Sequence, residues 1–381
     1  MKKKIFTALG LMSGTSMDGV DLSIVKSDGN TEFKEILDKY FEFDQNLQKK
    51  LLNLRKFIVT SKDLLKLSYE INEIEREFTL FNAKIINDVL DQYEDEVDII
   101  GFHGQTIFHD STNKISKQLG DGNLLSQILK KKVVNNFRQN DLINGGEGAP
   151  LTPIFHKLLA KKFKKKYQIN FPLNIINIGG ITNITQVLKD DNIDENNFFA
   201  LDIAPGNCLI DEWVRKNSKK KFDENGEIAS SGKIDELILN QALDNFNIKT
   251  YGKSLDVKDF DVSFVKGLSL EDGCATISKF TAYLIYKGIE YINNQNNSIP
   301  KYNILCGGGR KNKFLTKSIS NYLSKNQKLI EIENYNLNGD FIESQAFGYL
   351  SIRTFLELPI SFPNTTNCLR PTVGGEVISN F

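Results

Sequence analysis

Residues 1–25, MKKKIFTALGLMSGTSMDGVDLSIV, can be read in two ways. Three lysines, a short apolar run and then small residues follow the order of a secretory signal peptide. The same residues also fit a strand, a turn of small and hydroxylated residues, and a second strand in which Val20, Leu22 and Ile24 alternate with polar positions. No A-x-A type cleavage site follows the apolar run, and a cut there would destroy a well-formed hairpin. We therefore expect a hairpin of the folded protein and not an export signal.

A second stretch, in the middle of the chain, has the same design. Residues 173–188, LNIINIGGITNITQVL, fit a strand, a Gly-Gly turn and a second strand. The hairpins around Gly14 and Gly179 each open one half of the chain, which is a weak internal repeat. This repeat predicts two similar α/β domains that face each other across a cleft, with the main boundary near residue 145.

Strands and helices alternate around these hairpins. A helical block is expected from about Gln45 to Tyr93, a further helix over Glu271–Asn293, and an amphipathic final helix over Ser344–Leu358. The apolar run VDIIGF, residues 97–102, ends in the polar residues HGQT. An apolar strand that ends in polar residues is typical of a central strand with a ligand at its carboxyl edge.

Composition excludes several classes of function. Lys+Arg and Asp+Glu each number 48, so the formal net charge is zero, which argues against a large nucleic-acid or anionic membrane surface. The four cysteines lie far apart without CxxC spacing, so neither a zinc site nor a disulfide framework is expected. Only three histidines occur, which argues against a His-rich metal centre. No apolar stretch approaches the ~20 residues that span a bilayer.

The first hairpin turn has the composition of a phosphate-binding loop. GTSMDGVD, from Gly14 to Asp21, offers bare backbone N–H groups and the hydroxyls of Thr15 and Ser16. Asp18 and Asp21 supply carboxylate oxygens, which Mg²⁺ prefers as ligands. An ordinary β-turn that contains Asp and Gly would also explain this stretch.

Two further glycine-rich loops lie in the second half. NIGGITN repeats the bare turn at Gly179 and Gly180, and a simple Gly-Gly hairpin explains it about equally well. In ILCGGGRKN a buried strand leads into Gly307, Gly308 and Gly309 and then into a helix, an arrangement that often binds a nucleotide. The P-loop pattern is absent.

Isolated polar residues near predicted strand ends are further candidates. LDIAPGN places Asp202 at the end of an apolar strand, where the carboxylate could reach a substrate or cap the following helix. Arg138 suits bidentate contact with a carboxylate or phosphate, or a surface ion pair. Glu343 begins the final helix, where a first-turn position alone would explain it.

The HGQT stretch contributes three candidates. His103 is more often a satisfied structural histidine in such a position than a functional one. Gln105 and Thr106 could hydrogen-bond a sugar.

In combination these stretches resemble one family, the anhydro-N-acetylmuramic acid kinases. The resemblance runs from about Gly10 to Leu358, and the motifs are specific together although each is weak alone. LDIAPGN departs from the usual D-T-G-P-G-N because Ile203 and Ala204 replace Thr and Gly. The matching stretches, in order, are GLMSGTSMDGVD, HGQT, LGDGN, NFRQNDLINGGEGAP, NIGGITNIT, LDIAPGN, ILCGGG and ESQAFGYLSIRT.

The resemblance implies the fold shared by sugar kinases, Hsp70 and actin. This is an α/β fold with two RNase-H-like domains around a nucleotide cleft. The N-terminal domain would comprise residues 1–145, with residues 355–381 as a candidate completion, and the C-terminal domain residues 146–354.

The resemblance also implies an activity: ATP- and Mg²⁺-dependent phosphorylation of 1,6-anhydro-N-acetylmuramic acid in cytoplasmic peptidoglycan recycling. The products would be N-acetylmuramic acid 6-phosphate and ADP, and the partners only the amino sugar and water, with no nucleic acid or membrane. A homodimer is implied as well. Because O6 of this sugar is tied to C1, phosphorylation must be joined to opening of the anhydro ring by water. Asp202 matches the catalytic carboxylate of the family and would act as general base for that water.

Binding residues follow from the same match. Arg138 would pair with the lactyl carboxylate, and Asp18 and Asp21 would meet the metal, directly or through water. Residues implied to bind the sugar are Gln105, Thr106, Arg138 and Glu343. Residues implied to bind ATP are Gly14, Thr15, Ser16, Met17, Asp18, Gly19, Val20, Asp21, Gly179, Gly180, Gly307, Gly308 and Gly309.

Two other functions remain open. One is an actin- or Hsp70-like nucleotide-dependent binding module without a sugar substrate. The other is a kinase or hydrolase of the same fold that acts on a different anhydro-sugar. HGQT and NFRQND favour an enzyme because they add polar groups that an ATP switch alone does not need.

Overall fold

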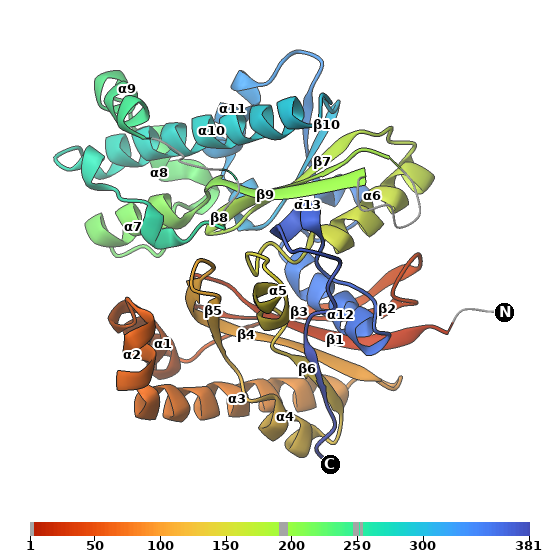
Figure 1. The fold of residues 1–381 in the computed structure, drawn as a ribbon. Helices are drawn as coiled ribbons and strands as arrows, with labels where there is room; N and C mark the ends of the chain where they lie inside the picture. Colours follow the sequence, from red (N-terminus) through yellow and green to blue (C-terminus); the bar gives the residue numbers. More distant parts are fainter. Residues whose placement is uncertain (1–3, 190–196, 247–250, 252–253) are drawn as a thin grey trace. The chain divides into compact units, whose positions relative to one another are not determined.

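The structure is a computed structural model that describes residues 4–189, 197–246, 251 and 254–381 (Figure 1). It divides into two compact units: unit 1 contains Met1–Leu158 and Phe341–Phe381, and unit 2 contains Leu159–Asp340. Within the described residues, no helix combines the length and apolar character that crossing a membrane requires.

The unit boundaries differ from the expected ones at residues 145 and 355. The chain leaves unit 1 within helix α6 (Pro153–Tyr167) and returns just before helix α12 (Ile342–Phe355). Phe155 in the first turn of α6 explains the later exit, because its ring contacts Phe33 and Tyr349 of unit 1 at 4.9 and 5.6 Å between centroids.

Unit 1 is built on one sheet of order β12-β6-β4-β1-β2-β3, with β5 paired to β4. Strands β1, β2 and β3 form an antiparallel meander, and β4 and β6 run parallel to β1. The strands are β1 (Phe6–Ser13), β2 (Gly19–Ser27), β3 (Phe33–Glu42), β4 (Ile99–Asp110), β5 (Ile115–Leu119), β6 (Lys132–Asn135) and β12 (Glu376–Ile378). The remaining helices are α1 (Gln45–Phe57), α2 (Ser61–Lys66), α3 (Ser68–Leu90), α4 (Gly122–Leu129), α5 (Gln139–Ile143) and α13 (Pro363–Thr366).

Different helices pack on the two faces of this sheet. On one face the alternating residues Val20, Leu22 and Ile24 of β2 join α1 and α3 in a buried apolar cluster, as the alternation predicts. On the other face α12 packs on β1, β2 and β4. It approaches so closely that a Cβ on Gly10 would lie 2.0 Å from the carbonyl oxygen of Ser344. The prediction that this helix is amphipathic is wrong, because nearly all of its side chains are buried.

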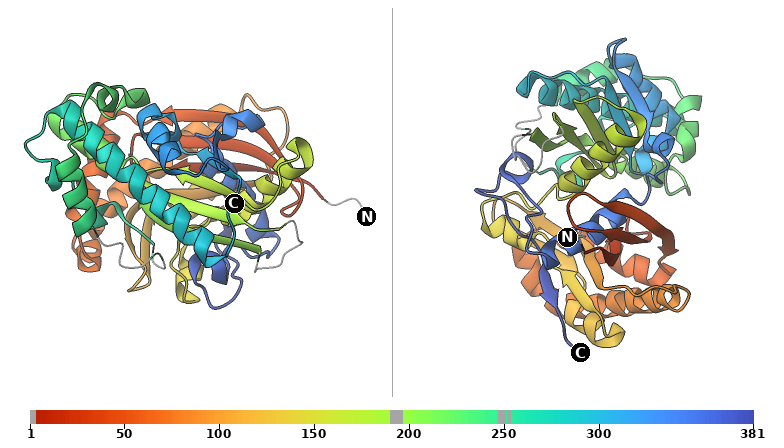
Figure 2. Two further views of the ribbon diagram at one scale, coloured as in Figure 1. Left: turned by 90° about the horizontal axis from the view of Figure 1, so that it is seen from above. Right: turned by 90° about the vertical axis from the view of Figure 1, so that its right-hand side faces the viewer.

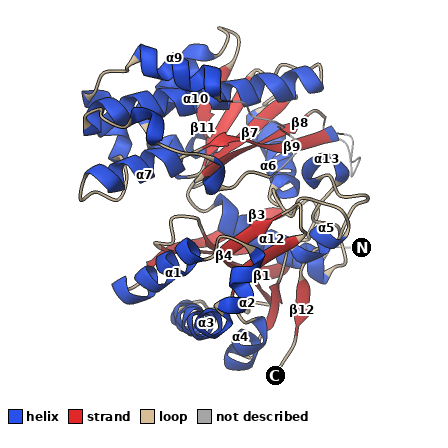
Figure 3. Cartoon of the chain, turned by 60° about the vertical axis from the view of Figure 1, so that its left-hand side comes forward, coloured by secondary structure: helices blue, strands red, loops and turns tan. Residues whose placement is uncertain are grey.

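Unit 2 repeats the topology of unit 1. Its sheet has the order β11-β10-β7-β8-β9, in which β7, β8 and β9 are antiparallel and β10 and β11 run parallel to β7 (Figure 3). In both sheets the first strand of the meander lies between the second and the next parallel strand. The two expected RNase-H-like units and the internal repeat are therefore confirmed. The strands of unit 2 are β7 (Leu173–Ile178), β8 (Ile181–Val187), β9 (Phe198–Pro205), β10 (Tyr302–Cys306) and β11 (Lys328–Glu331).

The helix α10 (Leu270–Gln295) lies along the sheet of unit 2 (Figure 2). Its Ile285, Ile289 and Ile292 join Ile176 and Ile184 of the sheet in one buried cluster. The other helices are α7 (Cys208–Asn217), α8 (Glu227–Ser231), α9 (Glu236–Asn245) and α11 (Lys313–Tyr322). Short 3₁₀ helices are η2 (Glu224–Gly226), η3 (Val257–Asp259), η4 (Ser263–Val265), η5 (Gly308–Lys311) and η6 (Ile332–Tyr335).

Candidate active site

The carboxyl ends of parallel strands bring the predicted residues of unit 1 together. Strands β1, β4 and β6 run in one direction, with Ser13 opposite Gln105 and Gly101 opposite Val134. The turn after β1, the HGQT stretch in β4 and Arg138 after β6 therefore meet at one edge of the sheet. The prediction that the strand ends at Phe102 is wrong, because pairing with β5 extends β4 to Asp110. An apolar run cannot reveal this extension, since it depends on a second strand.

Gln105 holds the first turn in place. Its Nε2 donates to the carbonyl oxygen of Gly14 at 3.0 Å, and its Oε1 accepts from the hydroxyl of Ser13 at 2.6 Å. Thr15 and Ser16 at the tip of the turn are exposed. Gln105 thus organises the loop, which is a role that the sequence does not predict.

A group of carboxylates lies beside this turn. Asp18 accepts a hydrogen bond from the hydroxyl of Ser16 at 2.5 Å. Burial and then the charges of Asp18, Glu42 and Asp21 raise the pKa of the Tyr40 hydroxyl. The carboxylates named for a metal therefore lie near one phenol, where their negative charge would attract a cation.

His103 and Gly148 are among the partners that hold Arg138. Its Nε and Nη2 lie 3.2 and 2.9 Å from Nε2 of His103, and its Nη1 donates to the carbonyl oxygen of Gly148 at 2.7 Å. His103 itself is buried, and its Nδ1 lies 2.8 Å from the carbonyl oxygen of Gly104. Burial, together with the charge of Arg138, keeps the pKa of His103 well below its ordinary value. His103 is thus a satisfied buried histidine, as expected, and also the partner of a predicted site residue.

Glu343 reaches the same edge on the opposite face. It lies in the first turn of α12, as predicted. This helix runs antiparallel to β1, because its start packs on Gly10 while Phe355 at its end contacts Phe6 at 5.5 Å. The N-terminus of α12 therefore lies at the edge where β1 ends, on the side opposite the α1–α3 cluster.

In unit 2, three glycine-rich stretches meet at the corresponding edge. The backbone N–H of Asn207 donates to the carbonyl oxygen of Gly179 at 2.8 Å, and that of Gly206 to Gly180 at 2.9 Å. A Cβ on Gly206 would lie 2.2 Å from the Gly179 oxygen, so only glycine allows this approach. The turn after β9 thus binds the turn of the second hairpin directly.

The triple glycine joins the same group. Gly307 adopts a φ of 78°, and a Cβ on it would lie 2.3 Å from Oδ1 of Asn177. The buried Arg310 holds this loop by donating to the Gly307 carbonyl at 2.9 Å and to Asp340 at 2.7 Å, and it also pairs with Glu333. Sequence reasoning missed Arg310, because nothing in GGGRKN shows that this one basic side chain is buried.

At three positions on these edges, neither backbone strain nor close packing against the described residues requires glycine. Among the described residues, the nearest atom to a Cβ on Gly14 would be Ser16 Oγ at 4.0 Å, and the nearest to one on Gly308 would be Asn207 Nδ2 at 3.7 Å. For Gly179 the nearest atom would be the Ile181 oxygen at 3.4 Å, and none of the three has a φ that favours glycine. Neither backbone conformation nor packing explains them. Without a side chain over them, backbone N–H groups in loops at helix and strand ends can bind the phosphates of a nucleotide.

Asp202 lies inside β9, and the residue is only 8% exposed. Its Oδ2 accepts the backbone N–H of Leu255 at 3.0 Å. The capping alternative is wrong, because Asn207 is the N-cap of α7. Directly opposite Asp202 on β8 is Asn183, whose Oδ1 is buried without a hydrogen-bond partner among the described residues. A buried carboxylate beside an unsatisfied amide oxygen fits a polar ligand or a water molecule.

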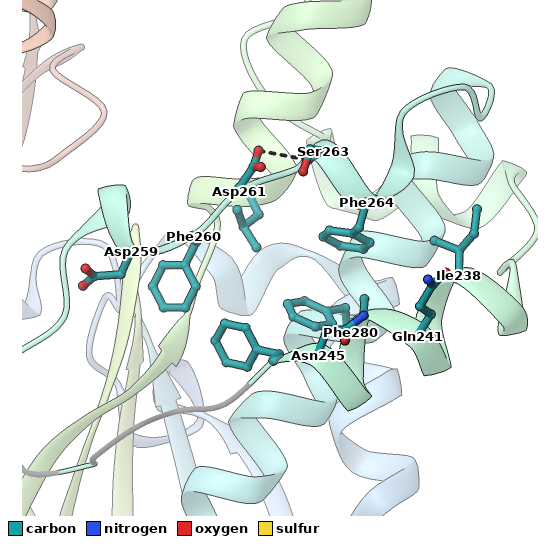
Figure 4. A pocket seen from close by; sticks show the side chains of 12 residues that line it. Ile238, Gln241, Asn245, Asp259, Phe260, Asp261, Ser263, Phe264 and Phe280 are labelled. Carbon is teal, nitrogen blue, oxygen red and sulfur yellow. Dashed lines mark hydrogen bonds between the residues drawn. The ribbon is translucent and has the colours of Figure 1, made fainter.

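Unit 2 also contains a cavity of about 460 Å³ between α7, α9 and α10, lined by residues such as Leu209, Ile238 and Phe280. Figure 4 shows the rings of Phe260, Phe264 and Phe280 close together in its lining, beside polar side chains such as Gln241 and Asn245. None of the predicted site residues lines this cavity. We do not place the nucleotide there.

The chain is similar in sequence to proteins of one family. A family model described as anhydro-N-acetylmuramic acid kinase matches residues 6–380. A protein of that name from Pelagibacter ubique is 55% identical over 100% of both chains. Another, from Agrobacterium fabrum, is 32% identical and covers 98% of this chain and 99% of its own. Among solved structures, a ROK family glucokinase from Streptomyces griseus with glucose and AMPPNP covers 91% of this chain and 99% of that chain. At 9% identity and a TM-score of 0.40 this likeness is too low to support an argument.

Proposed function

The chain belongs to the anhydro-N-acetylmuramic acid kinase family, ATP-dependent enzymes of cell-wall recycling, and we propose how its own residues carry out that reaction. The observation that supports the proposal best is the pair of similar sheet edges. Each has a bare glycine turn after its first strand, and the second edge holds the buried carboxylate of Asp202.

The substrate sets the chemistry. In 1,6-anhydro-N-acetylmuramic acid, O6 is bonded to C1 and has no proton to lose. Water attacks C1, the C1–O6 bond breaks, and O6 takes the γ-phosphoryl group. The leaving charge on O6 is neutralised by the new P–O bond, so a separate strong acid is unnecessary. The products are N-acetylmuramic acid 6-phosphate and ADP.

Asp202 is the general base for the attacking water. An inverting glycosidase uses a carboxylate in this way to take a proton from water on one face of the sugar. The position of Asp202 in the middle of β9 keeps the carboxylate on a rigid element, and the N–H of Leu255 holds one of its oxygens. This supports a base that is held in one position for the attacking water.

The glycine turns bind the nucleotide. ATP supplies the phosphoryl group, and the backbone N–H groups of the turns at Gly14, Gly179 and Gly308 bind its phosphates. The exposed hydroxyls of Thr15 and Ser16 add donors at the tip of the first turn. Preformed donors of this kind stabilise transferring phosphoryl oxygens without reorganisation.

Mg²⁺ would be bound jointly by protein carboxylates and by the phosphates of the nucleotide. Among the described residues, no group of three or more His, Cys, Asp or Glu side chains could hold a metal ion alone. Mg²⁺ is ordinarily bound by one or two carboxylates, with phosphate oxygens and waters completing the shell. Asp18 and Asp21, which lie around Tyr40, are the residues that would hold it.

Replacing Asp18 or Asp21 with asparagine is expected to raise the Mg²⁺ concentration for half-maximal rate by at least about tenfold. The reason is the loss of a charged oxygen ligand. Initial rates measured across a Mg²⁺ titration at fixed ATP test this. Asp95→Asn, an exposed carboxylate of the same unit that pairs with Lys26, is the control and should leave the titration unchanged. Unaltered titrations for both Asp18 and Asp21 variants would remove these residues from the metal site.

Gln105, Thr106, Arg138 and Glu343 form the sugar side of unit 1. The guanidinium of Arg138 supplies the charge that recognises the lactyl carboxylate, the group that distinguishes muramic acid from glucosamine. Gln105 also holds the Gly14 loop, so it links the sugar side to the phosphate-binding turn. Glu343 and Thr106 border the same sheet edge.

Incubation with ATP·Mg²⁺ and 1,6-anhydro-N-acetylmuramic acid tests the proposal. We expect a 6-phosphate product by mass spectrometry, in one-to-one ratio with ADP. ATP turnover without sugar and without this product would favour the nucleotide-dependent binding module. Product formed only from another anhydro-sugar would favour the second alternative.

We place the reaction in the cytoplasm and propose a homodimer. All four cysteines are free and buried, as in proteins of a reducing compartment. Light scattering of the purified chain tests the dimer, and the mass of a single chain would contradict it.

A further inference from the structure

His103 and Arg138 form a buried unit whose geometry has a consequence for substrate choice. We propose that His103 is a positioning residue that aims the Arg138 guanidinium at the lactyl carboxylate of the sugar. This inference rests on the proposed function and deepens it, because it names what sets the direction and the charge of the recognising group.

The hydrogen bonds define the orientation of the guanidinium. Nε and Nη2 both approach Nε2 of His103, at 3.2 and 2.9 Å, so the imidazole occupies one edge of the planar fork. Nη1 is fixed separately by the Gly148 carbonyl at 2.7 Å. A guanidinium held at these points cannot rotate about its Cδ–Nε bond without losing contacts. The geometry points the Nη1–Nη2 edge to the carboxylate, the arrangement that permits two parallel hydrogen bonds.

The tautomer of His103 is set by its surroundings. Nε2 can accept from Arg138 only if the ring proton is on Nδ1, and Nδ1 donates to the Gly104 carbonyl at 2.8 Å. Gly104 has a φ of 80°, and a Cβ on it would lie 2.2 Å from the Leu119 oxygen, so the backbone at this carbonyl is fixed. The ring of Phe347 packs on the imidazole at 4.4 Å between centroids. His103 is therefore constrained by hydrogen bonds on both nitrogens and by packing on its ring.

A neutral partner preserves the charge of the arginine. An Asp or Glu in place of His103 would also orient the guanidinium, but it would neutralise the positive charge that attracts the substrate. Burial and the nearby guanidinium keep His103 uncharged at physiological pH. The imidazole thus fixes the guanidinium without placing a negative charge beside it. Changes at His103 should therefore alter the KM only for substrates that carry the lactyl carboxylate.

Two isosteric variants test this orientation. The amide of His103→Gln reaches the position of Nε2 and can accept from Arg138, whereas the shorter amide of His103→Asn reaches only the position of Nδ1. We expect His103→Asn to raise the KM for 1,6-anhydro-N-acetylmuramic acid by about 10- to 100-fold, the effect of a lost hydrogen bond to a charged group. The kcat should change by less than about threefold, and His103→Gln should recover most of the affinity. Equal KM values for both variants and the wild type would overturn the proposal.

A double-variant cycle with Arg138→Met separates positioning from a general structural role. If His103 acts through Arg138, the variant that carries both His103→Asn and Arg138→Met has the same KM as Arg138→Met alone. If His103 only supports the fold, the increases in KM caused by His103→Asn and Arg138→Met multiply in the double variant, and the proposal fails. Thermal unfolding of each variant checks that the fold is retained. Failure of the proposed function would show separately, as a wild-type protein that makes no 6-phosphate product.

Discussion

Replacing Asp202 with asparagine is expected to cut turnover by roughly 10²–10⁴, the usual contribution of a general base. Asparagine has the same shape, and its Oδ1 can still accept the N–H of Leu255, so the loop contact remains. The amide cannot take a proton from water. The KM for ATP should stay near its wild-type value, because the phosphates bind the glycine turns and not Asp202. Steady-state kinetics with both substrates measure the two effects together.

The matched control is Asp235→Asn. Asp235 is a carboxylate of the same unit that accepts the N–H of Ile238 at 3.0 Å as the N-cap of α9. Asparagine caps helices as well as aspartate does, so activity and stability should both be preserved. Full activity of the Asp202→Asn protein would assign that carboxylate to structure alone.

Gly14→Ala and Gly308→Ala are expected to raise the KM for ATP by about 10- to 100-fold, the effect of losing charge-assisted backbone contacts to phosphate. A Cβ at either position has room among the described residues, so we expect it to obstruct a bound nucleotide and not the fold. Stability without nucleotide should be unchanged or raised by about 0.4–1 kcal/mol, because alanine restricts the unfolded chain. Thermal unfolding without ATP and kinetics at varied ATP measure the two effects separately.

Gly10→Ala should behave in the opposite way. This glycine lies in β1, and its Cβ would press on the Ser344 oxygen at 2.0 Å. We expect a loss of about 1–3 kcal/mol in the free energy of unfolding, as for other overpacked core sites. The variant that remains folded should bind ATP normally. If Gly14→Ala instead destabilised the fold and left the KM for ATP unchanged, the first turn would be a structural hairpin.

Local sequence pattern was enough to predict the two hairpins and the glycine loops. The alternation of Val20, Leu22 and Ile24 is a short-range property, and the turns at Gly14 and Gly179 follow from small residues between such strands. The repeat of one hairpin in each half also predicted two units of the same topology. The stretches at Gly179, Gly206 and Gly307 meet because parallel strands end at one edge, which topology alone requires.

Features that depend on distant partners could not be predicted. β5 extends β4 through HGQT, and the burial of α12 depends on close approach at Gly10 and Gly101. The expected helical block from Gln45 to Tyr93 consists of three helices, because Thr60 and Leu67 begin new ones. The side-chain contacts of His103 with Arg138 join residues 35 positions apart in sequence. Residue types identified the candidate site residues, but only the fold shows which of their side chains contact one another.

The central claim is that water activated by Asp202 opens the anhydro ring while O6 takes the phosphoryl group. A rapid-quench reaction in water labelled with heavy oxygen tests it most directly, with unlabelled product in the same water as the control for exchange. The account predicts heavy oxygen in the C1 hydroxyl of N-acetylmuramic acid 6-phosphate and none in its phosphate. Heavy oxygen in the phosphate, or a C1 hydroxyl without label, would contradict it.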